Sequence, residues 1–300
     1  MEGSAKERRK APIFVGVDTH SDTHVAVALD GAGRRLGELA VPNDRAGYTR
    51  LWDWTLGFGV SVAAGVEGTG SYGPGLLRFL RAKGARVLEV NRTSRQYRRR
   101  YGKHDAADAE AAARAVMAVM AGTASGEPKG ADGAAESLRA LRVAHRSAVK
   151  ARTQAANQLH ALLSTAPEGL REGLRGLPIK HLAAKAARLR CASDLADPAA
   201  ATKFALRSVA RRYRDLSEEI AGLEAQIERV ASHAAPELSA LDGVGPDTAA
   251  TLLIAAGDNP ERLKSEASFA HLCGAAPVQA SSGKVVRHRL NPGGNRDANR

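Results

Sequence analysis

"IFVGVDTHSDTHVAVAL" (residues 13–29) is the stretch of this chain that decides its fold. Its first half is an apolar run typical of a buried strand, and its second half alternates apolar and polar side chains as a second strand does. Asp18 ends the first strand, where burying an unpaired carboxylate removes hydration that nothing in the stretch replaces. The rest of the fold must therefore supply partners for Asp18.

Strands and helices continue to alternate through the first 122 residues. The patterns predict strands at 13–18, 23–30, 35–41, 60–67 and 85–90, and helices around Leu51, at 72–84 and at 104–122. The order β-β-β-α-β-α-β-α is typical of an α/β layered domain with a mixed sheet. It is the order of RNase H-like folds, so we predict an α/β RNase H-like domain over residues 11–122, although fold alone does not establish function.

The rest of the chain is predicted to be mainly helical. "GTASGEPKGADG" (122–133) is typical of a linker, and long patterns at 134–166 and 199–232 each carry a one-sided apolar stripe. We interpret residues 134–232 as a helical coiled-coil arm, whose stripes are explained either by packing within one chain or by a dimer. A small, mainly helical C-terminal domain is predicted over 236–300.

The composition indicates the class of partner. The chain has 44 Lys and Arg against 32 Asp and Glu, a formal net charge of +12. An excess of this size favours a polyanionic partner, because released counterions drive binding to phosphate backbones. A basic protein without a nucleic-acid partner is the alternative that composition leaves open.

The sequence also bears on the compartment. Cys191 and Cys273 lie far apart and match no metal or disulfide pattern, which suits a reducing environment. The start, "MEGSAKERRKAP", lacks an apolar signal core, and no stretch approaches the roughly 20 apolar residues of a membrane span. We therefore expect a cytoplasmic, nucleoid-associated protein with no membrane partner.

Three further acids are candidate partners of Asp18. Glu67 ends another apolar strand, and Asp105 and Asp108 stand three apart, which places them on one face of a helix. Clustered carboxylates repel one another without a cation, and Mg²⁺ binds such oxygen ligands. Two such ions roughly 4 Å apart can activate a nucleophile and stabilise a leaving oxygen in phosphodiester cleavage. Taken singly, each acid is equally well explained as a solvated helix-start or strand-end residue.

Histidines flank these acids at three positions, His20, His24 and His104. We interpret them as polar surface residues or as residues that support the ligands, and a role as a third ligand or as a base is the alternative.

Two segments are candidates for binding nucleic-acid backbones. "NRTSRQYRRRYGK" (91–103) interleaves aromatic rings with a basic run, typical of a nucleic-acid channel, although a solvated basic loop is the alternative. "LSALDGVGPDTAATLLIAAGD" (238–258) has the pattern of a helix-hairpin-helix whose glycines admit a phosphate, with a purely structural turn as the alternative. The candidate binding residues are Arg92, Arg95, Arg98, Arg99, Arg100, Lys103, Gly243, Gly245 and Thr248.

A basic, loop-like segment near the C-terminus contains two serines. Ser281 and Ser282 precede a glycine in "AAPVQASSGKVVRHRLNPGGNR" (275–296). A serine can attack phosphorus if its proton is removed and the phosphate is held. Lys284 and Arg287 are candidates for holding that phosphate. A Ser-Gly pair alone is weak support, since such pairs are common in loops.

Taken together, residues 13–300 resemble the DEDD insertion-sequence transposases, which are bridge-RNA-guided recombinases. The matching pieces, in order, are "GVDTH", "GVEGTGSYG", "KHDAADAEAAARA", "LDGVGPDTAATLLIAAGD", "CGAAPVQASSGK" and "GGNR". The resemblance implies a RuvC-like N-terminal domain, a coiled-coil arm and a C-terminal transposase domain with a nucleophilic serine.

The resemblance also implies roles for individual residues. It makes Asp18, Glu67, Asp105 and Asp108 ligands of Mg²⁺ or Mn²⁺, and it makes Ser282, immediately before the glycine, the nucleophile. The implied partners are donor and target DNA, a structured non-coding guide RNA, and further copies of the chain in a dimer or tetramer. The implied reaction passes through a phosphoserine before strand exchange.

The sequence departs from the family pattern in three places. His104 stands where a small hydroxyl residue is usual, and "LNPGGNR" is an unusual version of its segment. Family members commonly continue past "GNR" with another basic helix, so we expect a truncated C-terminal domain. The alternatives are therefore an inactive DNA-binding remnant and a RuvC-like metal-dependent endonuclease. A DEDD exonuclease would have Asp-x-Glu on the first strand, where this chain has Asp18-Thr19-His20.

Overall fold

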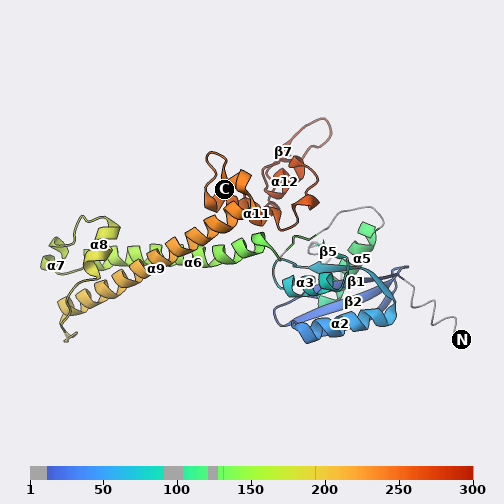
Figure 1. The fold of residues 1–300 in the computed structure, drawn as a ribbon, viewed down its shortest axis with the longest axis horizontal. Helices are drawn as coiled ribbons and strands as arrows, with labels where there is room; N and C mark the ends of the chain where they lie inside the picture. The colour runs from blue at the N-terminus through green and yellow to red at the C-terminus, as the bar shows by residue number, and fades with distance from the viewer. Residues whose placement is uncertain (1–11, 91–103, 121–127, 131, 193, 300) are drawn as a thin grey trace. The chain divides into compact units, whose positions relative to one another are not determined.

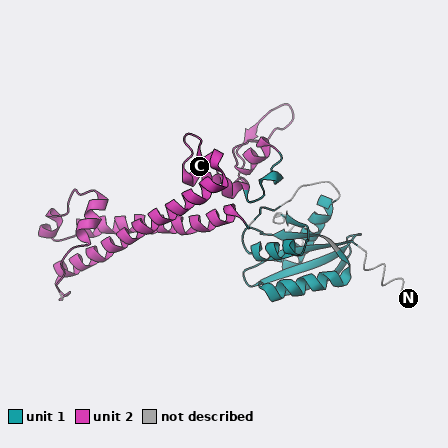
Figure 2. Ribbon diagram, in the orientation of Figure 1, with its two compact units in different colours: residues 1–132, 257–264 teal, residues 133–256, 265–300 magenta. Residues whose placement is uncertain are grey.

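The computed structural model describes residues 12–90, 104–120, 128–130, 132–192 and 194–299 (Figure 1). These residues form two compact units (Figure 2). Unit 1 comprises residues 1–132 and 257–264, and unit 2 comprises residues 133–256 and 265–300. None of the helices in the described ranges is both long and apolar enough to cross a membrane. The two cysteines are free.

Unit 1 is built on a five-stranded mixed sheet. Its strands are β1 (Pro12–Thr19), β2 (Thr23–Asp30), β3 (Arg35–Pro42), β4 (Val60–Glu67) and β5 (Val87–Val90), in the order β3-β2-β1-β4-β5. β1 pairs antiparallel with β2 and parallel with β4, which in turn pairs parallel with β5. The predicted strands are confirmed, and the mixed sheet with its helices fits the α/β RNase H-like class.

Helices cover both faces of this sheet. Helices α2 (Arg45–Phe58) and α3 (Pro74–Ala82) pack on one face, where their leucines meet the alternate apolar residues of β1 and β2. Helix α5 (Asp105–Met120) packs on the opposite face, through Ala109, Ala113 and Val116. The period-2 alternation of β1 therefore sends Ile13, Val15 and Val17 to one core and Phe14 to the other.

Alanine and glycine allow α5 to lie very close to the sheet. A Cβ atom on Gly16 of β1 would lie 2.0 Å from the Ala109 carbonyl oxygen and 2.2 Å from the Ala113 nitrogen. Both obstacles are backbone atoms, so no side-chain rotation relieves the clash. This contact fixes the start of α5 over the end of β1, where Asp18 lies.

We expect Gly16→Ala to lower the free energy of unfolding by at least about 3 kcal/mol, because overpacking against backbone forces the helix off the sheet. Gly57→Ala is the matched control. A Cβ at Gly57, in α2, would meet nothing within 4 Å, and alanine favours helix by about 1 kcal/mol over glycine. Urea unfolding followed by circular dichroism measures both changes. Equal stability of the two variants would contradict the close contact.

Unit 2 contains a pair of long antiparallel helices, α6 (Ala134–Ser164) and α9 (Pro198–Ala234). Leu138 near the start of α6 packs with Ile227 near the end of α9, and Leu159 packs with Leu206. The apolar stripes predicted from the sequence thus pack within one chain. Short helices α7 (Glu168–Glu172) and α8 (Ile179–Ala186) connect the pair.

The remainder of unit 2 follows α9. It comprises α10 (Pro236–Ser239), α11 (Pro246–Ala256), α12 (Glu266–Leu272) and the strands β6 (Val278–Gln279) and β7 (His288–Arg289). Helix α11 packs on the long helices, because Ala249 and Ala250 share a core with Leu138 and Ile227. The division of residues 134–300 into an arm and a separate C-terminal domain stays a prediction.

Residues 128–130, at the end of the predicted linker, are held within unit 1 by hydrogen bonds. Asn259, which adjoins the 3₁₀ turn η1 (Pro260–Arg262), accepts a hydrogen bond from the Gly130 nitrogen (2.6 Å) and donates one to the Pro128 carbonyl (3.0 Å). Arg81 of α3 donates to the same carbonyl at 3.2 Å. Small, turn-forming residues thus bind a partner that is 129 positions away in sequence. Their composition alone gave no sign of that partner.

Candidate metal centre and serine hairpin

Asp18 and Glu67 end neighbouring parallel strands on the same face of the sheet. Their strands pair in register up to Val17 and Val66, the residues immediately before them. Gly16 and Gly65 both approach α5, so the residues two positions later, Asp18 and Glu67, are on the face that α5 covers. Parallel strands place their carboxyl ends at one edge of a sheet. The fold therefore brings both of these strand ends to one edge of the sheet.

A side-chain hydrogen bond connects these two strand ends. The Thr19 hydroxyl, on the opposite face from Asp18, donates to the Glu67 carbonyl oxygen at 2.7 Å. Thr19 is only 7% exposed, so this bond is protected from competing water. It extends the β1–β4 pairing by one residue beyond the backbone register and orders the ends that carry the acids.

Helix α5 brings its first turn to the same edge. Asp105 and Asp108 both lie in that turn, where their charge favours the positive end of the helix dipole. Among the described residues, one group has potential metal-ligand atoms that all lie within 4.8 Å of one another, and it consists of Asp18, His20 and Asp105. Glu67 and Asp108 lie outside that group. Their role as ligands stays a prediction.

His20 is the member of this group that sequence reasoning did not select. Its Nε2 atom lies 3.1 Å from Asp18 Oδ2 and 3.5 Å from Asp105 Oδ1. The signal was its position two residues after Asp18, at the point where the chain leaves β1. The other flanking histidines differ: His104 is exposed, whereas His24 is fully buried and stacks on Tyr48 at 5.8 Å. The interpretation of His24 as a polar surface residue was wrong, because its β2 position faces the α2 core, and support of the ligands by His24 stays a prediction.

The electrostatics of Asp18 suit a cation. Burial raises the pKa of its carboxyl above the usual range, and the charges of Asp105 and Asp108 raise it further, while His20 opposes them. Asp18 is only 7% exposed, so solvent screens this repulsion weakly. Carboxylate oxygens suit hard divalent cations, and the imidazole nitrogen adds a ligand that Mn²⁺ accepts more readily than Mg²⁺. The donor set therefore fits a divalent metal.

Of the two segments predicted to bind nucleic acid, the structure describes one. The basic run 91–103, with all its candidate residues, lies outside the described part of the chain. The predicted hairpin runs through the turn between α10 and α11, where Gly243 has φ +80° and Gly245 precedes the helix. A Cβ at either glycine would meet nothing within 4 Å, so the backbone is open to approach. Thr248 lies in the first turn of α11. Backbone binding by this turn stays a prediction.

The two serines lie in a β-hairpin. Val278 pairs with Arg289, Gln279 with His288 and Ser282 with Val285, so Gly283 and Lys284 form a two-residue turn. Gly283 has φ +58°, which suits the first position of a type II′ turn. Alternation along the strands places Ser282 on the same face as Arg287 and Arg289.

The hydroxyls of the two serines differ in their bonding. Ser281 Oγ accepts from the Arg287 nitrogen at 3.2 Å and from Gln279 Nε2 at 3.2 Å. Ser281 therefore fastens the two strands together. Within the described residues, Ser282 makes backbone bonds to Val285 and its hydroxyl has no hydrogen-bond partner. The Ser281 hydroxyl is therefore engaged within the hairpin, whereas the Ser282 hydroxyl is not.

Comparison with known families gives two matches. The family described as a DEDD transposase of the IS110 type matches residues 15–167, which is more than half of the chain. The family described as "Transposase IS116/IS110/IS902 family" matches residues 235–300. Between them, the matched regions contain the acids on β1, β4 and α5 and the serine hairpin. No curated protein matches the chain.

Proposed function

This chain belongs to the IS110-type family of DEDD insertion-sequence transposases, and from that premise we propose an RNA-guided recombinase that exchanges DNA strands through a serine–phosphate intermediate. The observation that supports this proposal best is the pairing of two chemical sites in one chain. Unit 1 contributes a carboxylate group suited to a divalent metal, and unit 2 contributes a serine with an available hydroxyl. A nuclease that uses water would need only the first.

The metal would be held by Asp18, Asp105 and His20, with Glu67 and Asp108 as the remaining predicted ligands. When bound, Mg²⁺ or Mn²⁺ would offset negative charge at the reacting phosphate. The contribution of the chain itself is to position the ligands. Burial of Asp18 and the rigid end of β1 hold its carboxylate in place before any substrate arrives, so little reorganisation is needed during reaction.

Ser282 would form the covalent intermediate. Its oxygen bonds to phosphorus, the bond from phosphorus to one strand oxygen breaks, and the serine proton passes to solvent or to that leaving oxygen. Arg287 and Arg289, on the same face of the hairpin, would hold the phosphate, with Lys284 in the adjoining turn. A phosphoserine retains the energy of the phosphodiester for rejoining, whereas hydrolysis discards it.

The proposed partners are donor DNA, target DNA and a structured guide RNA, with the protein acting as a dimer or tetramer. The excess of positive charge, +12, supports binding to these polyanions. Base pairing by the RNA would supply the sequence choice, so the protein needs to hold backbones rather than to read bases. The test incubates the protein with RNA, both DNAs and a divalent cation, and recombined strands are the expected product. An endonuclease would yield only cut strands. A DNA-binding remnant would yield neither cut nor recombined strands.

Without RNA, we expect binding to DNA to weaken steeply with salt and to show little sequence preference. Backbone contacts release counterions, and about six contacts would lower the affinity roughly a thousandfold between 50 and 200 mM salt. Fluorescence anisotropy with two unrelated duplexes of equal length measures both properties. An affinity that is flat with salt, or that differs more than about tenfold between the duplexes, would contradict backbone binding.

A further inference from the structure

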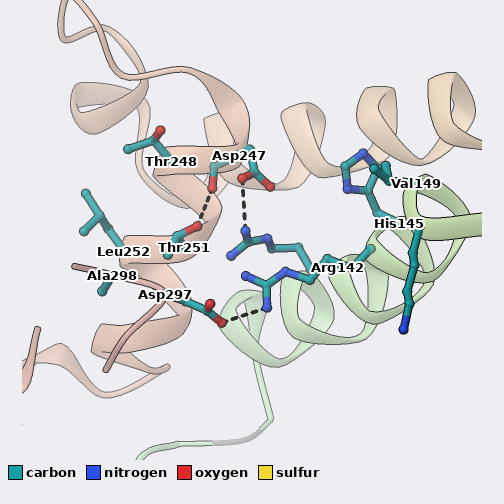
Figure 3. A pocket seen from close by; sticks show the side chains of 11 residues that line it. Arg142, His145, Val149, Asp247, Thr248, Thr251, Leu252, Asp297 and Ala298 are labelled. Atoms are coloured by element: carbon teal, nitrogen blue, oxygen red, sulfur yellow. Dashed lines mark hydrogen bonds and ion pairs between the residues drawn. The ribbon is translucent and has the colours of Figure 1, made fainter. Parts of the chain in front are cut away.

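Unit 2 contains a charged pocket that the metal centre and the serine hairpin do not use. It has a volume of about 450 Å³ and lies between α6, α11 and the C-terminal residues 297–298 (Figure 3). Basic side chains of α6 form one wall, and the first turns of α11 form another. Charged side chains outnumber apolar ones in its lining, which suits an ionic ligand.

The basic wall is a ladder along one face of α6. Arg142, Arg146 and Lys150 are spaced four residues apart, so they stack above one another over a length of about 12 Å. His145 lies beside them and contacts Glu224 of α9 at 3.2 Å. Lys150 forms no ion pair with any residue that the structure describes. The ladder thus carries three permanent positive charges toward one cavity.

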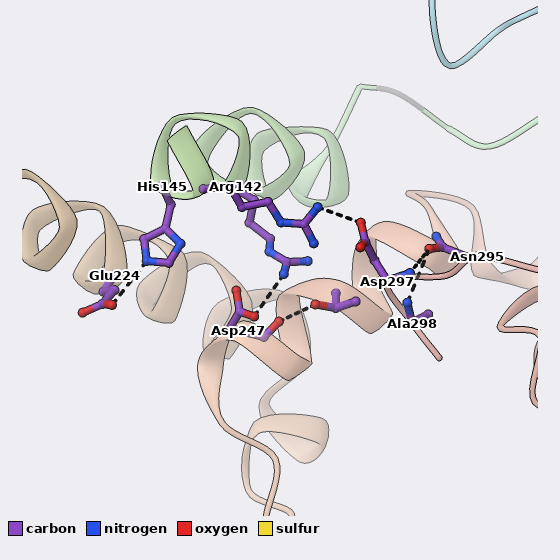
Figure 4. Close-up of polar contacts among 9 residues, drawn as sticks. Arg142, His145, Glu224, Asp247, Asn295, Asp297 and Ala298 are labelled. Atoms are coloured by element: carbon purple, nitrogen blue, oxygen red, sulfur yellow. Dashed lines mark hydrogen bonds and ion pairs between the residues drawn. The ribbon is translucent and has the colours of Figure 1, made fainter. Parts of the chain in front are cut away.

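Two carboxylates on the other walls contact this ladder (Figure 4). Arg142 Nη2 donates to Asp247 Oδ2 at 3.0 Å, and Arg146 Nη1 donates to Asp297 Oδ2 at 2.7 Å. Both partners of the Arg146–Asp297 pair are exposed (48% and 40%), so water screens this pair and it contributes little to stability. The Arg142–Asp247 pair joins a buried guanidinium to a 64% exposed carboxylate, and a phosphate that replaced Asp247 would keep the buried charge compensated.

The buried end of the ladder has an unused donor. The Arg142 side chain is only 9% exposed, and its Nε atom is buried with no hydrogen-bond partner in the described residues. A guanidinium presents its donors in a planar fork that matches two oxygens of a phosphate. Asp247 contacts only the Nη2 end of the Arg142 fork and leaves the Nε donor without an acceptor in the described part of the chain. Thr248, in the first turn of α11, adds a hydroxyl and the positive end of a helix to the same cavity.

We propose that this pocket binds backbone phosphates of a nucleic-acid strand, with Arg142, Arg146 and Lys150 as the contacting residues. In the free protein, Asp247 and Asp297 occupy the guanidinium groups that the strand's phosphates take over on binding. The proposal rests on the proposed function, which supplies the nucleic acid, and it locates one of its binding sites on the long helix α6. DNA and RNA share the phosphodiester chemistry, so the experiment treats them in separate arms.

The test measures binding by the full-length protein to a duplex DNA and, separately, to a single-stranded RNA of equal length, across a salt series. The double variant Arg146→Gln/Lys150→Gln removes two exposed members of the ladder and leaves buried Arg142 in place. It should lower the slope of log affinity against log salt by about 1.8 on the duplex or about 1.4 on the single strand. Near 0.1 M salt the affinity should fall on the order of 10- to 100-fold.

Two further variants separate phosphate binding from a structural role. Arg152→Gln removes one positive charge, against two in the double variant, from another face of the same helix outside the pocket. It should leave the slope within about 0.3 of wild type. Asp297→Asn frees Arg146 from its carboxylate and should tighten binding severalfold. If the ion pair only stabilised the fold, the same change would leave affinity unchanged or weaken it. Thermal melts followed by circular dichroism confirm that each variant is folded.

The outcomes assign the site or reject it. A change of slope in one arm only identifies that nucleic acid as the ligand, and a change in both assigns a general backbone site. Slopes of the double variant equal to those of Arg152→Gln in both arms overturn the pocket and leave the proposed function intact. Wild-type protein that shows no salt-dependent binding in either arm overturns both.

Discussion

Asp18→Asn is expected to lower strand cleavage on the order of a thousandfold or more, while nucleic-acid binding stays within about threefold of wild type. The substitution keeps the volume of the side chain and removes the buried charge of the candidate metal centre. A bound metal contributes several kcal/mol to stabilising charge at phosphorus, and each 1.36 kcal/mol is a factor of ten in rate. Cleavage of a labelled duplex by the RNA-loaded protein, with and without Mg²⁺ or Mn²⁺, measures the effect.

Although Asp18→Asn should lower cleavage, we expect it to raise the stability of the metal-free protein. Because the folded-state pKa of Asp18 is raised, its ionised form destabilises the fold, and stability declines as the pH rises through that pKa. Metal-free Asp18→Asn should therefore melt at a higher temperature than wild type at neutral pH, and the difference should shrink as the pH falls. Added Mn²⁺ should raise the melting temperature of wild type only.

Asp22→Asn is the matched control for this pair of measurements. Asp22 is an exposed carboxylate in the same β1–β2 turn, and it lies outside the Asp18, His20 and Asp105 group. Its variant should cleave, melt and respond to Mn²⁺ as wild type does. Cleavage by Asp18→Asn at wild-type rate would remove this cluster from the reaction.

Ser282→Ala is expected to eliminate the covalent protein–DNA adduct, with a loss of at least about a thousandfold in recombined product. The variant deletes only the hydroxyl, so the hairpin keeps the backbone pairing of residue 282 with Val285. No other group on that face of the hairpin is a nucleophile of comparable strength, because the neighbours are Val285, Arg287 and Arg289. Denaturing gels of protein incubated with RNA and labelled DNA report the adduct directly.

Ser281→Ala distinguishes the two neighbouring serines. It removes the hydroxyl that accepts from the Arg287 nitrogen, so it should loosen the hairpin and reduce the adduct roughly tenfold without abolishing it. Undiminished adduct in Ser282→Ala, with complete loss in Ser281→Ala, would reverse the assignment. Undiminished recombination in both variants would point to water and to a metal-dependent endonuclease chemistry.

Most of unit 1 was predictable because its signals are local. Alternation in β2, the apolar run of β1 and the Ala-rich pattern of α5 each specify an element from its own residues, and the strand order follows from how such elements pack. The acids were predictable for the same reason, since each lies at the end of an element. What the sequence could not show was which side chain completes the group. His20 lies in the β1–β2 turn, and its Nε2 atom meets Asp105 only because α5 packs on the sheet.

Long-range features were missed for a physical reason. Asn259 binds residues 128–130 through a side-chain amide, and an isolated asparagine before a proline gives no period or motif. The difference in hydrogen bonding between the Ser281 and Ser282 hydroxyls follows from the register of the hairpin. That register is set by the turn that begins at Gly283, one residue after Ser282. Sequence patterns identified the segments, whereas hydrogen bonds between segments distinguish the side chains within them.

The return of residues 257–264 to unit 1 has a consequence for the order in which the chain matures during synthesis. The segment that carries Asn259 leaves the ribosome only after residues 133–256 have been made. At about 5 to 20 residues per second, translation from residue 133 to residue 264 takes on the order of ten seconds. Throughout that interval, the carboxylate-bearing domain lacks its final piece. A nascent chain released before residue 264 would therefore carry the acids on an unfinished scaffold, which makes completion of this domain dependent on prior synthesis of the long helices.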